Sequence, residues 1–163
     1  MAKSDSFFIR AKTDTNGTTY AQTSVDCGAY VDALGKSVLR IHNIEVQYGS
    51  PLELISGAPN TTTRSGFQLT TQSQTALVGI TDKSVIASGS LTIATNAANA
   101  DFIQDSLDVG PQRWTKGYLV GVEQLYLGVD QQFDHVDEIS VILECTVETL
   151  SSAAAMALAL SQQ

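Results

Sequence analysis

The sequence predicts an all-β sandwich, and two observations carry this prediction. Residues 138–148 alternate apolar and polar side chains, with Ile142 as the single exception. A period of two buries one face of a strand and leaves the other face in water. The apolar runs 37–48 and 117–129 also alternate, but the phase slips at His42-Asn43 and at Glu123-Gln124. Each slip predicts either a β-bulge or a corner where a strand leaves one sheet for another, as strands of a sandwich do.

The N-terminal part of the chain is predicted to form two strands joined by a tight turn. Residues 6–12 predict the first strand, and residues 18–25 predict a Thr-rich strand that returns from it. Asn16-Gly17 between them is the strongest short hairpin signal, because both residues tolerate a positive φ. Residues 27–31 are expected to extend the returning strand.

The middle of the chain predicts a loop, several short strands and a short inserted helix. Pro, Gly, Asn and Thr residues predict a loop over 49–65, with one brief strand at 52–55. Short strands are then expected at residues 67–71, 76–80, 84–87 and 90–94, at the spacing of all-β architecture. Apolar residues within 96–107 predict one or two helical turns capped by Asn96, which would bridge two strands across the end of the sandwich.

Residues 149–163 predict a C-terminal helical tail. Thr149 or Ser151 is the expected N-cap of an Ala-rich helix over residues 153–160. Apolar side chains cover most of the circumference of this helix, so it should not stand alone in water. It is expected to pack either on the sheet of its own protomer or on a neighbouring subunit. The side chains predicted to form an oligomer interface are Leu150, Met156, Leu158 and Leu160.

Length and composition predict one folded domain over residues 1–163. Hydrophobic residues make up 43% of the chain and charged residues only 16%, which argues against disorder. The 17 acidic residues outnumber the 9 basic ones, for a formal charge of −8. Because the basic residues are scattered singly, direct binding to nucleic acid is not expected. No run approaches the ~20 apolar residues that span a bilayer, and the N-terminus lacks the apolar core of a secretory signal.

The two cysteines lie in separate strand-like runs. Cys27 and Cys145 show neither the close spacing of a metal knuckle nor that of a redox pair. Two small buried side chains are one interpretation. A disulfide between them is the other, provided that their strands are neighbours.

No pattern of catalytic residues is present in the sequence. It contains no nucleophile elbow, no phosphate-binding glycine loop and no zinc-binding helix. The chain is therefore not expected to be an enzyme, and no catalytic residue, cofactor or metal ligand is predicted. The acidic turn from Asp134 to Glu138 contains the carboxylates of Asp134, Asp137 and Glu138, which could hold a calcium-like cation. A solvated turn between two strands explains the same residues.

About eight strands, long Greek-key connections and an inserted helix together predict a jelly-roll β-sandwich. The Thr- and Gly-rich loops around Asn60 and Ala98, the run 118–129 and the final alternating strand resemble the single jelly-roll capsid proteins of icosahedral viruses. The resemblance covers most of residues 7–147. It implies a structural protein of the virion that self-assembles, with copies of itself and other virion proteins as partners.

One feature departs from that family. Many of its members carry a basic N-terminal arm that contacts the genome, and Lys3, Arg10 and Lys12 are a poor substitute for one. A coat protein of this kind would leave the genome to another component, to an internal membrane layer, or without a direct contact. The alternative function is a lectin-like carbohydrate-binding sandwich, with Trp114, Tyr118 and Tyr126 as a sugar-stacking platform.

Overall fold

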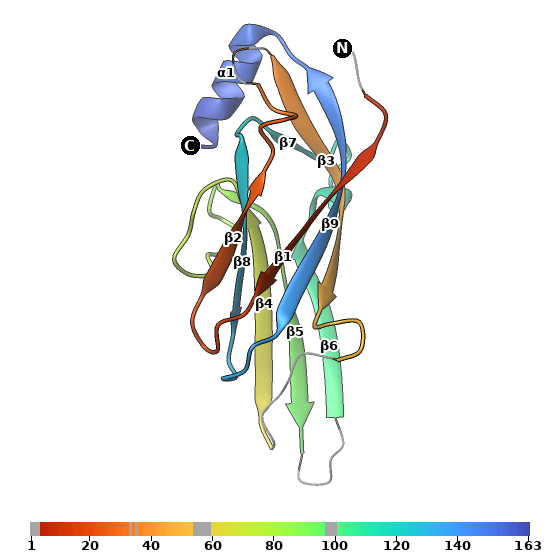
Figure 1. The fold of residues 1–163 in the computed structure, drawn as a ribbon, viewed down its shortest axis with the longest axis vertical. Coiled ribbons are helices and arrows are strands. Elements are labelled where there is room, and N and C mark those ends of the chain that lie inside the picture. Colours follow the sequence, from red (N-terminus) through yellow and green to blue (C-terminus); the bar gives the residue numbers. More distant parts are fainter. Residues whose placement is uncertain (1–3, 33, 35, 54–59, 97–100) are drawn as a thin grey trace.

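The chain folds into two antiparallel sheets that face each other, with one helix at one end of the sandwich, as a computed structural model shows (Figure 1). The structure describes residues 4–32, 34, 36–53, 60–96 and 101–163. The first sheet has the order β1 (Phe7–Asp14), β9 (Glu138–Thr149), β3 (Ser37–Tyr48), β7 (Tyr118–Val120). The second has the order β2 (Ala21–Asp26), β8 (Gln124–Gln131), β4 (Thr62–Thr70), β5 (Val85–Thr95), β6 (Asp101–Val109).

The strand pairs are nested along the sequence. β1 pairs with β9, β2 with β8, and β3 with β7, while β4 and β5 form the innermost pair. Successive nested pairs alternate between the two sheets. This is the arrangement of a jelly roll, in which one long antiparallel ribbon is rolled into two packed sheets. The predicted jelly-roll β-sandwich with a C-terminal helix is confirmed, and β6 adds a further strand beside β5.

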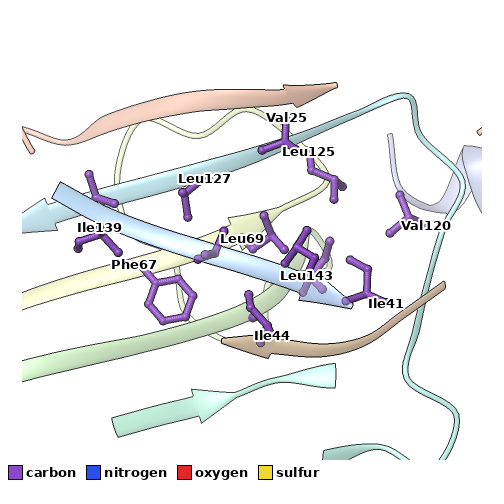
Figure 2. Close-up of a cluster of buried hydrophobic side chains, with 14 of the residues drawn as sticks. Val25, Ile41, Ile44, Phe67, Leu69, Val120, Leu125, Leu127, Ile139 and Leu143 are labelled. Atoms are coloured by element: carbon purple, nitrogen blue, oxygen red, sulfur yellow. The ribbon is translucent and has the colours of Figure 1, made fainter. Parts of the chain in front are cut away.

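The hydrophobic core lies between the two sheets. The alternation in β9 is confirmed, because Ile139, Val141 and Leu143 are buried whereas Ile142 faces outward. β3, β4 and β8 contribute the opposing and flanking side chains, among them Ile41, Ile44, Phe67, Leu69, Leu125 and Leu127 (Figure 2). Burial of these side chains from both sheets provides the main driving force that holds the layers together.

Both predicted phase slips are confirmed, and each has a different structural cause. In β3 the pairing with β9 shifts between Ile41 and Asn43, which makes a β-bulge at His42. At Glu123-Gln124 the chain turns a corner instead, since β7 belongs to the first sheet and β8 to the second. In both places the slip in the sequence marks where the residues that face the core change from even to odd positions or the reverse. A bulge and a corner between sheets both have this effect.

A glycine fits against the bulge. Gly117, just before β7, has a φ of +64°, which glycine adopts without a steric penalty. A Cβ atom at this position would overlap the carbonyl oxygen of Ile41 and approach the Cα of His42 to 3.3 Å. Gly117 therefore allows the chain to pass directly over the bulged part of β3.

The predicted hairpin at Asn16-Gly17 is wrong in its strand pairing. The turn itself forms, with Gly17 at a φ of +57° and an isolated bridge between Asn16 and Thr19. The strands on either side of it, however, pair with β9 and β8 in different sheets. The expected extension over 27–31 is also wrong, because β2 ends at Asp26 and the amide of Val31 donates to the Cys27 carbonyl in a turn.

Three predictions in the middle of the chain need correction. The loop predicted over 49–65 ends earlier, because β4 begins at Thr62. The strands predicted at 84–87 and 90–94 are one strand, β5. Residues 76–80 form no strand, since the side chain of Gln68 holds this segment through the Ala76 carbonyl and the Val78 amide. Of the brief strand at 52–55, residues 54 and 55 lie outside the described residues.

The predicted inserted helix is wrong, because its described residues form the edge strand β6. β6 pairs with β5 along its length, with Ile103 opposite Ile93 and Leu107 opposite Gly89. The spacing of Ile103 and Leu107 fits one face of a helix and one face of a strand equally well. Pairing with the otherwise open edge of β5 satisfies the backbone groups of this segment and decides between the two. Residues 97–100 lie outside the described residues, and a short 3-10 turn, η1 (Pro111–Arg113), follows β6.

Candidate assembly surfaces

The tail forms the predicted helix, α1 (Ser152–Ser161), at one end of the sandwich (Figure 1). Ser151 is its N-cap, because its side-chain oxygen accepts a hydrogen bond from the Ala154 amide at 3.3 Å. Thr149, the other predicted cap, is the last residue of β9. Among the described residues, no helix has the length and apolar character needed to cross a membrane.

The inner face of α1 packs on its own protomer, where the chain crosses from β7 to β8. Ala155 and Ala159 are buried on this face. They can approach closely because the contacted residue is Gly121. A Cβ atom there would lie 3.0 Å from Cγ of Leu158 and 3.1 Å from the Ala159 amide nitrogen. Small residues on both sides thus allow the helix to lie against the backbone of the crossing.

Gln162 anchors the end of this helix through hydrogen bonds. Its side chain is only 4% exposed, accepts from the Gly121 amide at 2.8 Å and donates to the Leu119 carbonyl at 2.7 Å. Its main-chain oxygen accepts from the hydroxyl of Thr71 at 3.1 Å. Sequence reasoning missed this residue. The signal that could have revealed it is the spacing of Ala155, Ala159 and Gln162, which places all three on one helix face.

The outer face of α1 is apolar and uncovered in the described protomer. Met156 is 49% exposed and Leu160 is 66% exposed, and residues four apart lie on the same helix face. Of the other two predicted interface residues, Leu158 turns toward Gly121. Leu150 is half-buried before the helix, where its amide donates to the Lys36 carbonyl. The structure therefore brings two of the four predicted residues together on one outward surface.

A second candidate surface is the outer face of the first sheet. A groove of about 520 Å³ runs over β1, β9 and β3 there. Ile142, the exception to the alternation in β9, is 38% exposed and lies in this groove. Arg10 and Glu45 line its two sides. The residue that breaks the pattern is thus an apolar side chain on the solvent side of the sheet.

The aromatic residues predicted as a sugar-stacking platform do not form one. Trp114 and Tyr118 contact each other, with ring centroids 5.7 Å apart and an interplanar angle of 38°. Tyr126 lies in β8 of the other sheet, where its hydroxyl donates to Gln124 at 3.2 Å. A groove of about 650 Å³ on that second sheet is lined by none of the three. They are edge and partly buried residues of the sandwich.

The carboxylates of the acidic turn are directed to different partners. Glu138 accepts a hydrogen bond from the ammonium of Lys12 at 3.1 Å. Asp137 lies 3.3 Å from Nδ1 of His135, and Asp134 lies beside Gly17. Within the described ranges, no group of three or more potential ligands could hold a metal ion. The described turn is thus tied together by contacts within the protein.

The two cysteines are free thiols buried in the same core. Burial, and to a smaller extent the nearby Asp26 carboxylate, raises the pKa of Cys27 to about 11. Burial also raises the pKa of Cys145 to about 12, with Cys27 as the next contributor. Of the two interpretations of the sequence, the small buried side chains are confirmed and no disulfide is present.

Both thiols are expected to resist labelling in the folded protein. Near pH 8 almost no reactive thiolate is available at a pKa of about 11 or about 12, and burial blocks the reagent. Ellman's reagent should therefore react slowly with the native protein, faster as the pH rises, and rapidly with both thiols in guanidinium chloride. Rapid reaction of the native protein near pH 8 would contradict the buried positions.

The nested strand order and the packed tail define a jelly-roll β-sandwich protein with a C-terminal helix. No protein-family model matches the chain, and no curated protein matches it in sequence. Among the solved structures that are similar to this chain is one of Desmodium yellow mottle tymovirus, at 10% sequence identity and a TM-score of 0.30, covering 90% of each chain. The fold class is established by the strand pairing described above.

Proposed function

We propose that the protein is a structural, self-assembling protein: a viral capsid protein whose copies form the shell of a virion. The observation that carries the proposal is the outer face of α1, where Met156 and Leu160 remain exposed. The helix is held on its inner face by Gln162, so it cannot turn these side chains inward. Burial of one such side chain contributes about 1.5–3 kcal/mol, which contact with another copy would supply.

The fold and the charge distribution support this proposal. Jelly-roll sandwiches build many viral capsids and lectin domains. Several basic side chains are engaged within the chain, with Arg40 bound to Glu148, Lys12 to Glu138 and Lys83 to the main-chain oxygen of Gln163. With a net charge of −8, the protein is a poor ligand for nucleic acid. Its proposed partners are copies of itself and other virion proteins.

The proposal assigns the protein no catalytic role. His42 contacts the hydroxyl of Thr146 at 3.0 Å on the first sheet, and His135 pairs with Asp137 in the acidic turn. Neither histidine lines either of the two grooves described above. Residues 1–163 act in this proposal as one jelly-roll domain, with residues 149–163 as its docking tail.

Assembly is expected to depend on Leu160. A Leu160→Lys substitution places a charge on the proposed contact, and loss of one buried leucine should raise the protein concentration needed for assembly about tenfold or more. Light scattering and negative-stain microscopy of the purified protein would measure this. Thermal stability should change little, because the side chain is exposed in the protomer.

Ser161→Lys is the matched control, because it adds the same charge to the neighbouring exposed position of the same helix. It should leave assembly close to wild type. A wild-type protein that stays monomeric at every concentration, or one whose assembly ignores Leu160→Lys but fails with Ser161→Lys, would overturn the proposal.

A further inference from the structure

A row of three outward side chains crosses the first sheet at its centre. Arg10 in β1 and Glu45 in β3 both lie directly opposite Ile142 of β9. Side chains at directly opposed positions of antiparallel strands share one face of the sheet. That face is the outer one, because the sequence neighbours of all three residues are buried or pack against the core. Across the sheet, the row therefore presents a positive, an apolar and a negative side chain in that order.

The two charges of this row are available for an external contact. Across the described residues, no ion pair is found for Arg10 or Glu45, whose backbones lie about 10 Å apart because two strand spacings of about 4.8 Å separate β1 from β3. The guanidinium of Arg10 lies only over the ring of Phe8, at 5.8 Å. The neighbouring Lys12, in contrast, is already bound to Glu138. The groove thus presents one cation, one anion and an exposed isoleucine between them.

We propose that a second copy of the chain docks on this face, so that the first sheets of the two copies face each other. The two-fold axis lies between these two sheets, runs roughly parallel to β9 and passes over Ile142. This inference rests on the proposed self-assembly and assigns one of its contacts. Rotation about such an axis exchanges the β1 side and the β3 side of the face. Arg10 then meets Glu45 of the second copy, Glu45 meets Arg10 of the second copy, and Ile142 packs on its own counterpart.

The charge pattern selects this axis over the alternative. A two-fold axis across the strands would place Arg10 on Arg10 and Glu45 on Glu45, and like charges in an interface are strongly disfavoured. The axis along β9 makes the surface complementary to itself, as a two-fold interface requires. Opposed sheets also exclude water from the exposed Ile142.

The neighbouring rows are compatible with the same axis. Lys12 comes to lie opposite Gln47 of the second copy, and Phe8 opposite Asn43 of the second copy. Glu144 lies in β9 near the axis, where two carboxylates would repel each other. Each Glu144 is drawn toward β3, because it accepts a hydrogen bond from Asn43 at 2.7 Å. Because β3 lies on opposite sides of the axis in the two copies, the two Glu144 side chains point in opposite directions. The ~30° twist between packed sheets separates their carboxylates further.

A charge-swap experiment tests the contact. Sedimentation equilibrium in the Leu160→Lys background, where the tail contact is weakened, measures dimer formation alone. Arg10→Glu and Glu45→Arg are each expected to raise the dimer dissociation constant about tenfold or more, and the double variant should restore most of the loss. Lys116→Glu, an exposed residue outside this face, makes the same charge change as Arg10→Glu and should have little effect.

The outcomes separate this contact from shell formation. The two-fold contact would be overturned if neither single substitution changed the dimer dissociation constant, or if the double variant did not restore dimer formation. Particles formed by the wild-type protein would still support the capsid proposal in that case. A dimer that depends on Arg10 and Glu45 in a protein that never forms larger particles would support the contact and overturn the shell.

A cross-linking experiment locates the axis. Ile142→Cys places two thiols across the two-fold, so a short bis-maleimide reagent should convert the dimer into a covalent one. The native Cys27 and Cys145 are buried and should not react. Ser24→Cys, on the exposed surface of the other sheet, is the control and should give no covalent dimer. A dimer that forms in solution but is not captured through Ile142→Cys would overturn the proposed axis.

Discussion

Replacing Arg40 with alanine is expected to lower the free energy of unfolding by about 3–5 kcal/mol, because it removes one partner of a buried ion pair. Nε of Arg40 donates to one carboxylate oxygen of Glu148 at 2.7 Å, and the second guanidinium nitrogen donates to the other at 2.8 Å. The side chain of Glu148 is 0% exposed and that of Arg40 is 11% exposed. The substitution would leave a buried carboxylate without the two donors that Arg40 supplies.

The same guanidinium links three parts of the first sheet. Arg40 belongs to β3 and Glu148 to β9, and a further nitrogen of Arg40 donates to the carbonyl of Lys116 before β7. The loss should therefore weaken the end of the sandwich where α1 is docked. Arg40→Lys is expected to be intermediate, because a single ammonium cannot reproduce the planar two-pronged contact.

Urea denaturation monitored by circular dichroism would measure the effect of Arg40→Ala. Arg64→Ala, which removes an exposed arginine on the second sheet, is the matched control and should change the unfolding free energy by no more than about 0.5 kcal/mol. Equal effects of the two substitutions would contradict the assignment of Arg40 as a buried structural residue.

Leu143→Ala is expected to destabilise the protein by about 2–5 kcal/mol through lost burial and the cavity left behind. Leu143 is fully buried at the centre of β9. Its backbone neighbours are Ile9 of β1 and Ile44 of β3, and its side chain points toward the second sheet (Figure 2). Because it packs between strands from both sheets, the surrounding core has little freedom to collapse into the cavity.

Thermal and urea denaturation would measure this loss as well. Leu52→Ala is the matched control, because it makes the same substitution at a residue that is 96% exposed. It should change the free energy of unfolding by no more than about 0.5 kcal/mol. Both proteins should be compared at several concentrations, because self-association stabilises the folded state by mass action. A Leu143→Ala protein as stable as Leu52→Ala would contradict the position of Leu143 in the core.

Local patterns in the sequence were sufficient for the main strands and the tail. The alternation in residues 138–148 predicted β9, and the slip at His42-Asn43 predicted a bulge or a corner in that run, because side-chain parity along a strand is a local property. The structure has the bulge in β3. The cap at Ser151 and the Ala-rich run predicted α1 in the same way. The candidate surface residues Met156 and Leu160 followed from the apolar circumference of that helix.

Only the tertiary structure decided which strands pair and which apolar residues remain outside. Asn16-Gly17 determines a turn, but the choice between one sheet and two depends on the distant strands β8 and β9. Residues 101–109 fit a helix or a strand, and the open edge of β5 made them a strand. Ile142 is exposed and Gln162 is buried because of how residues far away in the sequence pack around them. Pairing and burial depend on long-range contacts, which no local period encodes.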